Sequence, residues 1–230
     1  MLKKKKKKIR GWLFENRYQL LLISILLVMF DSLLFNDVTF YQMYIWPLNM
    51  LFFGINASNV ITSKRRKYFY VLLVLSFLAP FLWFLFAEHL LFVRCMLLIY
   101  TLLYWITLVN IVTGIFKSKK VTFNMILGAF CGYLLLGLIA TFSNMALLTY
   151  MPDAIDGLAY FNDYVVNQRQ DDIFVDIMYY SFITMTSIGY GDFLPIVPDS
   201  KMLAVFIGIS GQFYMTVIVA LIIGKYLNRK

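Results

Sequence analysis

The segment from Thr186 to Asp192 combines hydroxyl, glycine, tyrosine and carboxylate residues in a spacing that suits a dehydrated cation. In an extended strand, successive carbonyl groups point in opposite directions. Gly189 and Gly191 can adopt positive φ at no steric cost, so this backbone can turn its carbonyl groups to one side. A row of aligned carbonyl oxygens binds a cation through dipoles and needs no charged side chain. The chemistry predicted for this segment is therefore ion selection in a pore.

The composition of the chain is that of a membrane protein. Of its 230 residues, 61% are hydrophobic and only 14% are charged, and the mean hydropathy is +0.76. Soluble domains are about 45–50% apolar, so we expect membrane lipid as the surroundings. The net charge of +9 lies in short runs between apolar segments, which indicates membrane topology and not a nucleic-acid partner. His89 is the only histidine, so no histidine-based metal or catalytic cluster is expected, and we do not expect an enzyme.

Apolar runs long enough to cross a bilayer, about 20 residues each, fill nearly the whole chain. We expect six spans, at 18–35, 38–61, 68–87, 90–116, 121–150 and 201–227. They divide the chain into a basic tail (1–17), a four-helix region (18–117) and a pore domain (118–230).

Basic residues fall on alternate ends of these six spans. The clusters lie at 1–10, 64–67, 117–120 and 225–230. Because cytoplasmic loops carry an excess of lysine and arginine, we expect a multi-pass protein of the plasma membrane with cytoplasmic N- and C-termini. The chain ends soon after Leu227, so no soluble ligand-binding domain is expected.

The apolar run from Phe174 to Thr186 is too short to cross the membrane. The spans on either side already account for the crossings, so this run begins and ends on the same side. We therefore expect a re-entrant helix. Its non-helical continuation must be buried in protein or line a water-filled space.

Residues 179–192, Tyr-Tyr-Ser-Phe-Ile-Thr-Met-Thr-Ser-Ile-Gly-Tyr-Gly-Asp, resemble the pore helix and selectivity filter of potassium channels. The resemblance extends over about 121–227 and is closest to prokaryotic two-helix-plus-pore channels, whereas the first four spans carry no such motif. It implies an all-α integral membrane protein with six transmembrane helices, a re-entrant pore helix and a selectivity filter.

The resemblance also implies roles for individual residues. The carbonyl groups of Ser187, Ile188, Gly189 and Tyr190 would bind potassium, the permeant ion, with Gly191 completing the filter; no other cofactor is implied. The family usually has threonine where this chain has Ser187, so the methyl group that restricts the side-chain rotamer is missing. The residues implied to support the filter are Tyr179, Tyr180, Thr186 and Asp192, and the Tyr179 phenol is expected to reach Asp192.

In the last span, the resemblance places a gating hinge at Gly211 and an inner constriction at Val219 and Ile223. Close helix packing explains Gly211 equally well, and both interpretations remain open. Gly128 and Gly132 form a small-xxx-small pair in the fifth span, which predicts a packing face.

One filter segment in the chain cannot surround an ion; the resemblance implies that four copies close the ring, so a homotetramer is expected. The fourth span has a single basic residue, Arg94, which predicts no steep voltage dependence. We expect Arg94 to pair with a carboxylate, either Asp31 or Glu88. The function expected is a potassium-selective channel that conducts passively, its gating stimulus unknown. The alternatives are a non-conducting membrane scaffold or channel subunit, and a secondary cation transporter.

Overall fold

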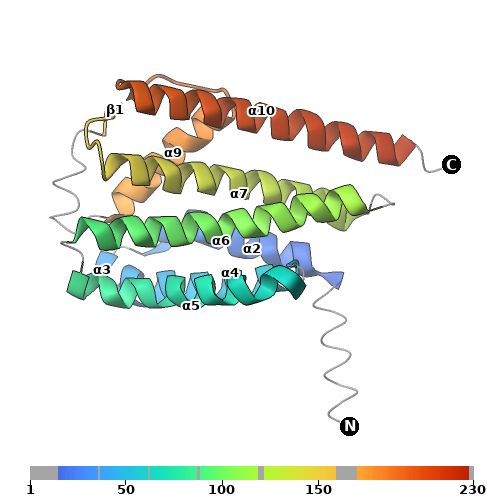
Figure 1. Ribbon diagram of the computed structural model, residues 1–230, viewed down its shortest axis with the longest axis horizontal. Helices are drawn as coiled ribbons and strands as arrows, with labels where there is room; N and C mark the ends of the chain where they lie inside the picture. The colour runs from blue at the N-terminus through green and yellow to red at the C-terminus, as the bar shows by residue number, and fades with distance from the viewer. Residues whose placement is uncertain are drawn as a thin grey trace, which may run out of the picture.

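The computed structural model of the chain describes residues 15–35, 37–61, 63–86, 89–118, 122–158 and 170–227. The first part contains α2 (Arg17–Phe30), the 3₁₀ turn η1 (Asp31–Leu34), α3 (Val38–Phe40), the π-helical turn η2 (Tyr41–Ile45), α4 (Trp46–Ser58), α5 (Ser63–Phe86) and α6 (Leu90–Lys117). The second part contains α7 (Phe123–Leu148), β1 (Ile155–Asp156), α9 (Gln170–Met185), β2 (Leu194–Pro195) and α10 (Pro198–Leu227). The long helices lie side by side (Figure 1).

Four described helical segments are long and apolar enough to cross a membrane: Arg17–Leu34, Leu90–Lys117, Phe123–Leu148 and Pro198–Leu227. They coincide with the predicted first, fourth, fifth and sixth spans within a few residues. In the second predicted span, helix continues from Val38 to Ser58 but changes pitch at η2. Pro47, at the start of α4, has no backbone N–H to donate, which accounts for the disturbed helical pattern just before it. The six-span arrangement stays a prediction.

Helix α7 is the centre of the fold. It packs against α2, α6, α9 and α10, and 72% of its most apolar stretch is buried, against 22% for α10. Glycines on α7 admit aromatic rings from these neighbours: Gly128 faces the ring of Tyr18, and Gly132 faces the phenol of Tyr214. The predicted packing role of this glycine pair is confirmed.

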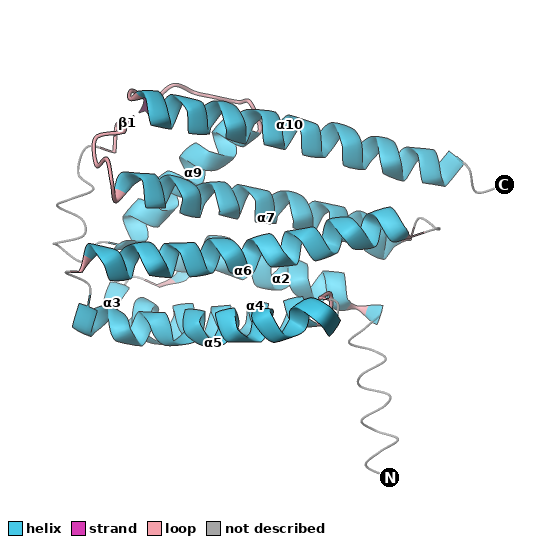
Figure 2. Cartoon of the chain, in the orientation of Figure 1, coloured by secondary structure: helices cyan, strands magenta, loops and turns pink. Residues whose placement is uncertain are grey.

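Helix α9 enters the bundle obliquely between α7 and α10 and ends partway along it. The loop that follows α9 runs back along α10 to the end of the bundle where α10 begins (Figure 2). Because the chain enters and leaves at the same end, α9 and its loop have the form of the predicted re-entrant segment.

The basic clusters of the described residues gather at the opposite end of the bundle. The beginnings of α5 and α7 lie there together with the ends of α6 and α10 (Figure 1). Residues 64–67, Lys117 and Lys225 belong to these helix ends. The predicted clusters that fall on described helix ends thus lie at one end of the bundle, whereas the cluster at 1–10 lies outside the described residues.

Candidate functional site: the re-entrant segment

Helix α9 is fixed to α7 by a buried polar pair and by close packing. The Asn144 side-chain amide donates a hydrogen bond to the Ser181 hydroxyl at 2.9 Å, and both residues are almost fully buried. Two turns before Asn144 on α7, the ring of Phe182, the residue after Ser181, occupies the space that a side chain at Gly137 would need. A buried amide without its partner would be costly, so the Asn144–Ser181 pair fixes the register of α9 on α7. Sequence reasoning did not identify this pair.

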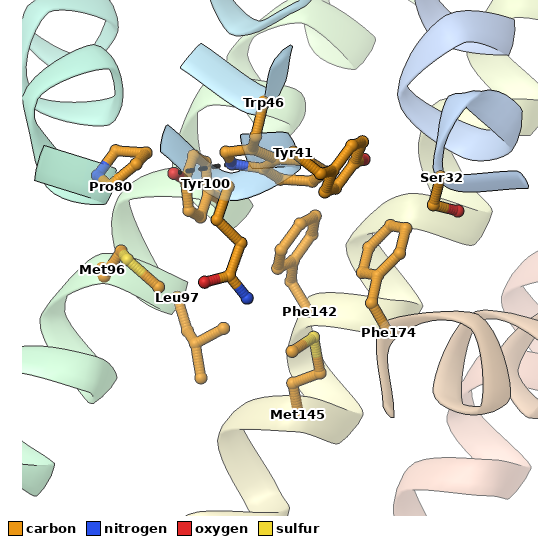
Figure 3. A pocket seen from close by; sticks show the side chains of 11 residues that line it. Ser32, Tyr41, Trp46, Pro80, Met96, Leu97, Tyr100, Phe142, Met145 and Phe174 are labelled. Carbon is orange, nitrogen blue, oxygen red and sulfur yellow. Dashed lines mark hydrogen bonds between the residues drawn. The ribbon is translucent and has the colours of Figure 1, made fainter. Parts of the chain in front are cut away.

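The outer end of α9 contacts the first helices through aromatic side chains. The ring of Phe174 lies 5.4 Å from that of Trp46 and 5.8 Å from that of Phe142. These three rings border a mainly apolar cavity of about 80 Å³, where the Trp46 indole N–H donates to the Tyr100 hydroxyl at 3.0 Å (Figure 3). The N-terminal helices and the re-entrant helix therefore share one packed core.

The end of α9 is closed by backbone hydrogen bonds to its last turn. The amides of Ile188 and Gly189 both donate to the Ile183 carbonyl, at 2.9 and 3.2 Å, and the Ser187 amide donates to the Thr184 carbonyl at 3.1 Å. The predicted support residue Thr186 donates its hydroxyl to the Phe182 carbonyl at 2.7 Å. These bonds satisfy carbonyl groups that a helix end leaves free, and they fix where the loop begins.

Beyond this cap, positive φ recurs at every second residue. Ser187 has φ +60°, Gly189 +54° and Gly191 +85°. Ser187 is the only non-glycine residue with positive φ in the described part of the chain. The intervening Ile188 and Tyr190 are not among the residues with positive φ, so the sign of φ alternates from residue to residue.

The side chains of this loop have no cover within one chain. Ile188 is 55% exposed and Tyr190 is 72% exposed, and no atom lies within 4 Å of the position a side chain would take at Gly189 or Gly191. Large apolar residues exposed in this way mark a surface that contacts lipid or another protein chain.

Tyr179 lies beside the outer half of the loop, as predicted. Its phenol lies close enough to the side chain of Asp192 for the two groups to interact. Its ring stacks on that of Tyr190, with centroids 6.4 Å apart and planes 4° apart, and meets Phe193 edge-on at 5.8 Å. The expected contact between Tyr179 and Asp192 is therefore present in the structure.

Tyr180 lies in a different place from its neighbour. It is 2% exposed and packs with the apolar residues under the outer loop, which are Leu148, Ala154, Ile155, Leu158, Ile173 and Ile177. Both tyrosines were predicted to support the filter; Tyr179 stacks on Tyr190, and the supporting role of each stays a prediction.

The segment that follows α7 also holds the chain that follows the 186–192 loop. Ile155 pairs with Pro195 in a two-stranded antiparallel sheet, and the Ile196 amide donates to the Ala154 carbonyl at 3.1 Å. The 186–197 loop is thus fixed at both of its ends, by the α9 cap and by this sheet.

Gly211 lies where α10 crosses the end of α9. A side chain at this position would overlap the carbonyl oxygen and Cγ of Met185. Of the two interpretations left open by the sequence, the structure supports close packing at Gly211; a hinge there stays a prediction.

Val219 and Ile223 are 44% and 53% exposed. They follow Gln212 by seven and eleven residues, which places both within about 20° of the Gln212 face of α10. Gln212 contacts Ser187, because its amide nitrogen lies 2.9 Å from the serine oxygen. The predicted constriction residues therefore share a helix face with the residue that reaches the inner end of the filter loop.

The prediction of an ion pair between Arg94 and Asp31 is wrong. The carboxylate of Asp31 accepts hydrogen bonds from Tyr41 and Asn49. Arg94 instead donates to the backbone carbonyl and the hydroxyl of Thr149, at 2.8 and 3.2 Å, and lies 3.7 Å from the centre of the Tyr150 ring. The start of α6 and the end of α7 meet at this contact. The position of Arg94 along the sequence could not indicate which helix lies beside it. The alternative partner, Glu88, lies outside the described residues.

Comparison with known families agrees with this architecture. Residues 153–228 match the family described as ion channel, and this stretch contains β1, α9, the filter loop and α10. No curated protein and no solved structure matches the chain. The channel domain, together with four long apolar helices, indicates a location in the membrane. Residues 153–228 therefore match an ion channel domain of the two-helix-plus-pore type, in agreement with the resemblance of the 179–192 motif.

Proposed function

We propose that this protein is a homotetrameric potassium-selective channel that conducts passively across the plasma membrane. In this proposal potassium binds to the carbonyl groups of Ser187, Ile188, Gly189 and Tyr190, the permeant ion being the only ligand required. The apolar side chains of Val219 and Ile223 form the inner constriction.

The observation that carries the proposal is the positive φ at residues 187, 189 and 191. Regular strand conformation makes alternate carbonyl groups point to opposite sides. Positive φ at every second residue turns the intervening peptide groups, so that consecutive carbonyl oxygens can face one side. Rings of such oxygens replace the hydration shell of potassium in the channels that this motif resembles.

The exposed surface of the loop supports assembly from four chains. One chain supplies oxygens on only one side of an ion, and a rotational axis must supply the others. The uncovered side chains of Ile188 and Tyr190 and the sparsely buried α10 provide an apolar surface for neighbouring copies and lipid. Assembly around the loop would remove Ile188 and Tyr190 from water.

The charge distribution supports the orientation that we propose. The beginning of α5 and the ends of α6 and α10 carry basic residues at one end of the bundle. The positive-inside tendency places that end in the cytoplasm, together with both termini. The filter loop then opens toward the outside. The division into a basic tail (1–17), a four-helix region (18–117) and a pore domain (118–230) is part of the same proposal.

The proposal is tested by ion-selective currents of the purified full-length protein in planar bilayers with potassium opposed to sodium. We expect unitary currents that reverse near the potassium equilibrium potential. Reversal near the sodium potential would contradict potassium selectivity. A correctly assembled protein without unitary currents would support a non-conducting subunit, whereas flux strictly coupled to a second ion gradient would support a transporter.

Removing the Tyr179 hydroxyl should shorten the time for which the channel stays conducting. Tyr179→Phe keeps the ring stacked on Tyr190 but removes the hydroxyl that interacts with the Asp192 side chain, so the outer part of the filter is held less firmly. We expect inactivation to become several-fold faster under steady depolarisation, measured in macroscopic currents. Tyr180→Phe is the matched control, because this neighbouring ring packs under the outer loop. Equal kinetics in the wild type and Tyr179→Phe would contradict the supporting role.

Arg94→Gln should lower the thermal stability of the protein without changing its voltage dependence. The substitution removes a charged hydrogen bond to the Thr149 carbonyl, worth about 1.5–3 kcal/mol, and the contact with the Tyr150 ring. Thermal unfolding in detergent should therefore begin several degrees lower. One charge per subunit supplies at most about 2.3 kcal/mol per 100 mV, so the slope of open probability against voltage should stay shallow in both proteins. Unchanged thermal stability would show that the Arg94 contacts contribute nothing.

A further inference from the structure

Gln212 joins the inner helix to the inner end of the filter loop. It lies on α10 immediately after Gly211, whose lack of a side chain lets α10 approach Met185 closely. From this position the Gln212 amide nitrogen donates a hydrogen bond to the Ser187 hydroxyl oxygen at 2.9 Å. The bond connects residues 25 positions apart in the sequence, across the boundary between α10 and the loop that follows α9.

The Ser187 hydroxyl needs such a partner more than a threonine hydroxyl would. Serine has no second substituent on Cβ, so its χ1 angle is less restricted than that of threonine. Ser187 also has φ +60°, a conformation that non-glycine residues rarely adopt. A hydroxyl group has one proton and two lone pairs. The amide donor occupies one lone pair, which fixes the oxygen and leaves the second lone pair for another ligand.

We infer that Gln212 is the positioning residue for the Ser187 hydroxyl, which belongs to the innermost ring of the filter in the proposed function. The inference rests on the proposed function. The hydrogen bond from α10 then restricts the side-chain rotamer of Ser187, as the methyl group of a threonine would do. Any movement of α10 at Gly211 then also changes the geometry of this innermost site.

Barium block from the cytoplasmic side provides the test. Ba²⁺ is close to K⁺ in size and carries twice the charge, so its residence time depends strongly on how each oxygen is oriented. Gln212→Met keeps the length of the side chain but removes the donor. We expect barium to leave the pore about tenfold faster, a change of the size expected for one lost hydrogen bond. Gln212→Asn, which is too short to reach Ser187, should behave in the same way.

A double-mutant cycle separates positioning from general disturbance of the pore. In a Ser187→Ala background the oxygen is absent, so Gln212→Met should cause no further change in barium residence. Thr216→Val, one turn further along the same face of α10, is the matched control for altered polarity and should leave the residence time unchanged.

The outcomes distinguish this inference from the proposed function. A wild-type protein that conducts potassium selectively, with unchanged barium residence in Gln212→Met and Gln212→Asn, would overturn the inference alone. The same holds if Gln212→Met still acts in the Ser187→Ala background. A correctly assembled wild-type protein without potassium-selective current would overturn the proposed function and this inference with it.

Discussion

Replacement of Gly189 by alanine should abolish potassium-selective current while the chain still folds and inserts. Gly189 has φ +54°, and an L-residue in this region costs about 1–2 kcal/mol. Four subunits each carry this cost within one narrow ring, and a change of the backbone to negative φ relieves it. That change would turn the carbonyl group of the filter away from its neighbours, and the ring of oxygens would be lost.

The expected defect is conformational and not steric. No atom of the same chain lies within 4 Å of the position that the new methyl group would take, and the loop lies outside the buried core. Thermal stability and insertion of Gly189→Ala should therefore match those of the wild type, while bilayer recordings should show no potassium-selective openings.

Gly224→Ala is the matched control for this experiment. Gly224 is a helical residue of α10 with open space around it and an ordinary φ, so alanine there should preserve the current and favour the helix slightly. Potassium-selective openings of normal conductance in Gly189→Ala would contradict the role proposed for the alternating backbone.

The spacing of the glycines allowed the backbone conformation of the proposed filter to be predicted from the sequence. Gly189 and Gly191 predicted a segment in which φ can be positive without steric cost, and both residues have positive φ in the structure. The same conformation at Ser187 could not be predicted, because serine usually avoids it. At Ser187 the positive φ accompanies the hydrogen bonds that the amides of Ile188 and Gly189 donate to the Ile183 carbonyl. These hydrogen bonds depend on how α9 ends.

Contacts between helices were less predictable than the helices themselves. Apolar length and charge placement indicated where most long helices lie, but they do not specify which faces meet. The depth of Arg94 suggested a carboxylate at similar depth, whereas α6 lies against α7, and Thr149 and Tyr150 are therefore its neighbours. The pair Asn144 and Ser181 was missed for the same reason, since single polar residues in apolar helices show no periodic pattern.

At Gly211 the family resemblance and the observed packing suggest different roles for the glycine. The family resemblance suggested a hinge, and the packing against Met185 shows that glycine is required there even if α10 never bends. A packing role restricts substitution as strongly as a hinge does. The identity of the residue therefore cannot decide between them, and only movement of α10 can.

Lys225→Met should lower the open probability of the channel by about tenfold. The Lys225 ammonium group donates to the carbonyl oxygens of Ile115, Phe116 and Ser118, at 2.6, 3.1 and 2.7 Å. These carbonyl groups lie at the end of α6, where helical partners are lacking and the dipole favours a cation. Each hydrogen bond from a charged group is worth about 1.5–3 kcal/mol, and partial exposure favours the lower value.

The direction of the effect follows from the position of Lys225 on its helix. It follows Gln212 by thirteen residues, a rotation of about 220°, so it points away from the face that carries Val219 and Ile223. Its bonds to α6 therefore draw the end of α10 away from the proposed pore axis, which favours a wide inner mouth. Without them, α10 can move toward the axis, and the apolar side chains of Val219 and Ile223 can close the pore by expelling water.

Single-channel recording at fixed voltage measures this shift. Lys201→Met is the matched control, because it makes the same change at the other end of α10 and should leave the open probability unchanged. Lys225→Arg retains several N–H donors and the charge, so it should preserve most of the wild-type behaviour. An open probability that rises in Lys225→Met would reverse the direction argued here and place the contact with α6 in the closed state. If Lys225→Met and Lys201→Met behave alike, the four-helix region does not act on the gate through this lysine.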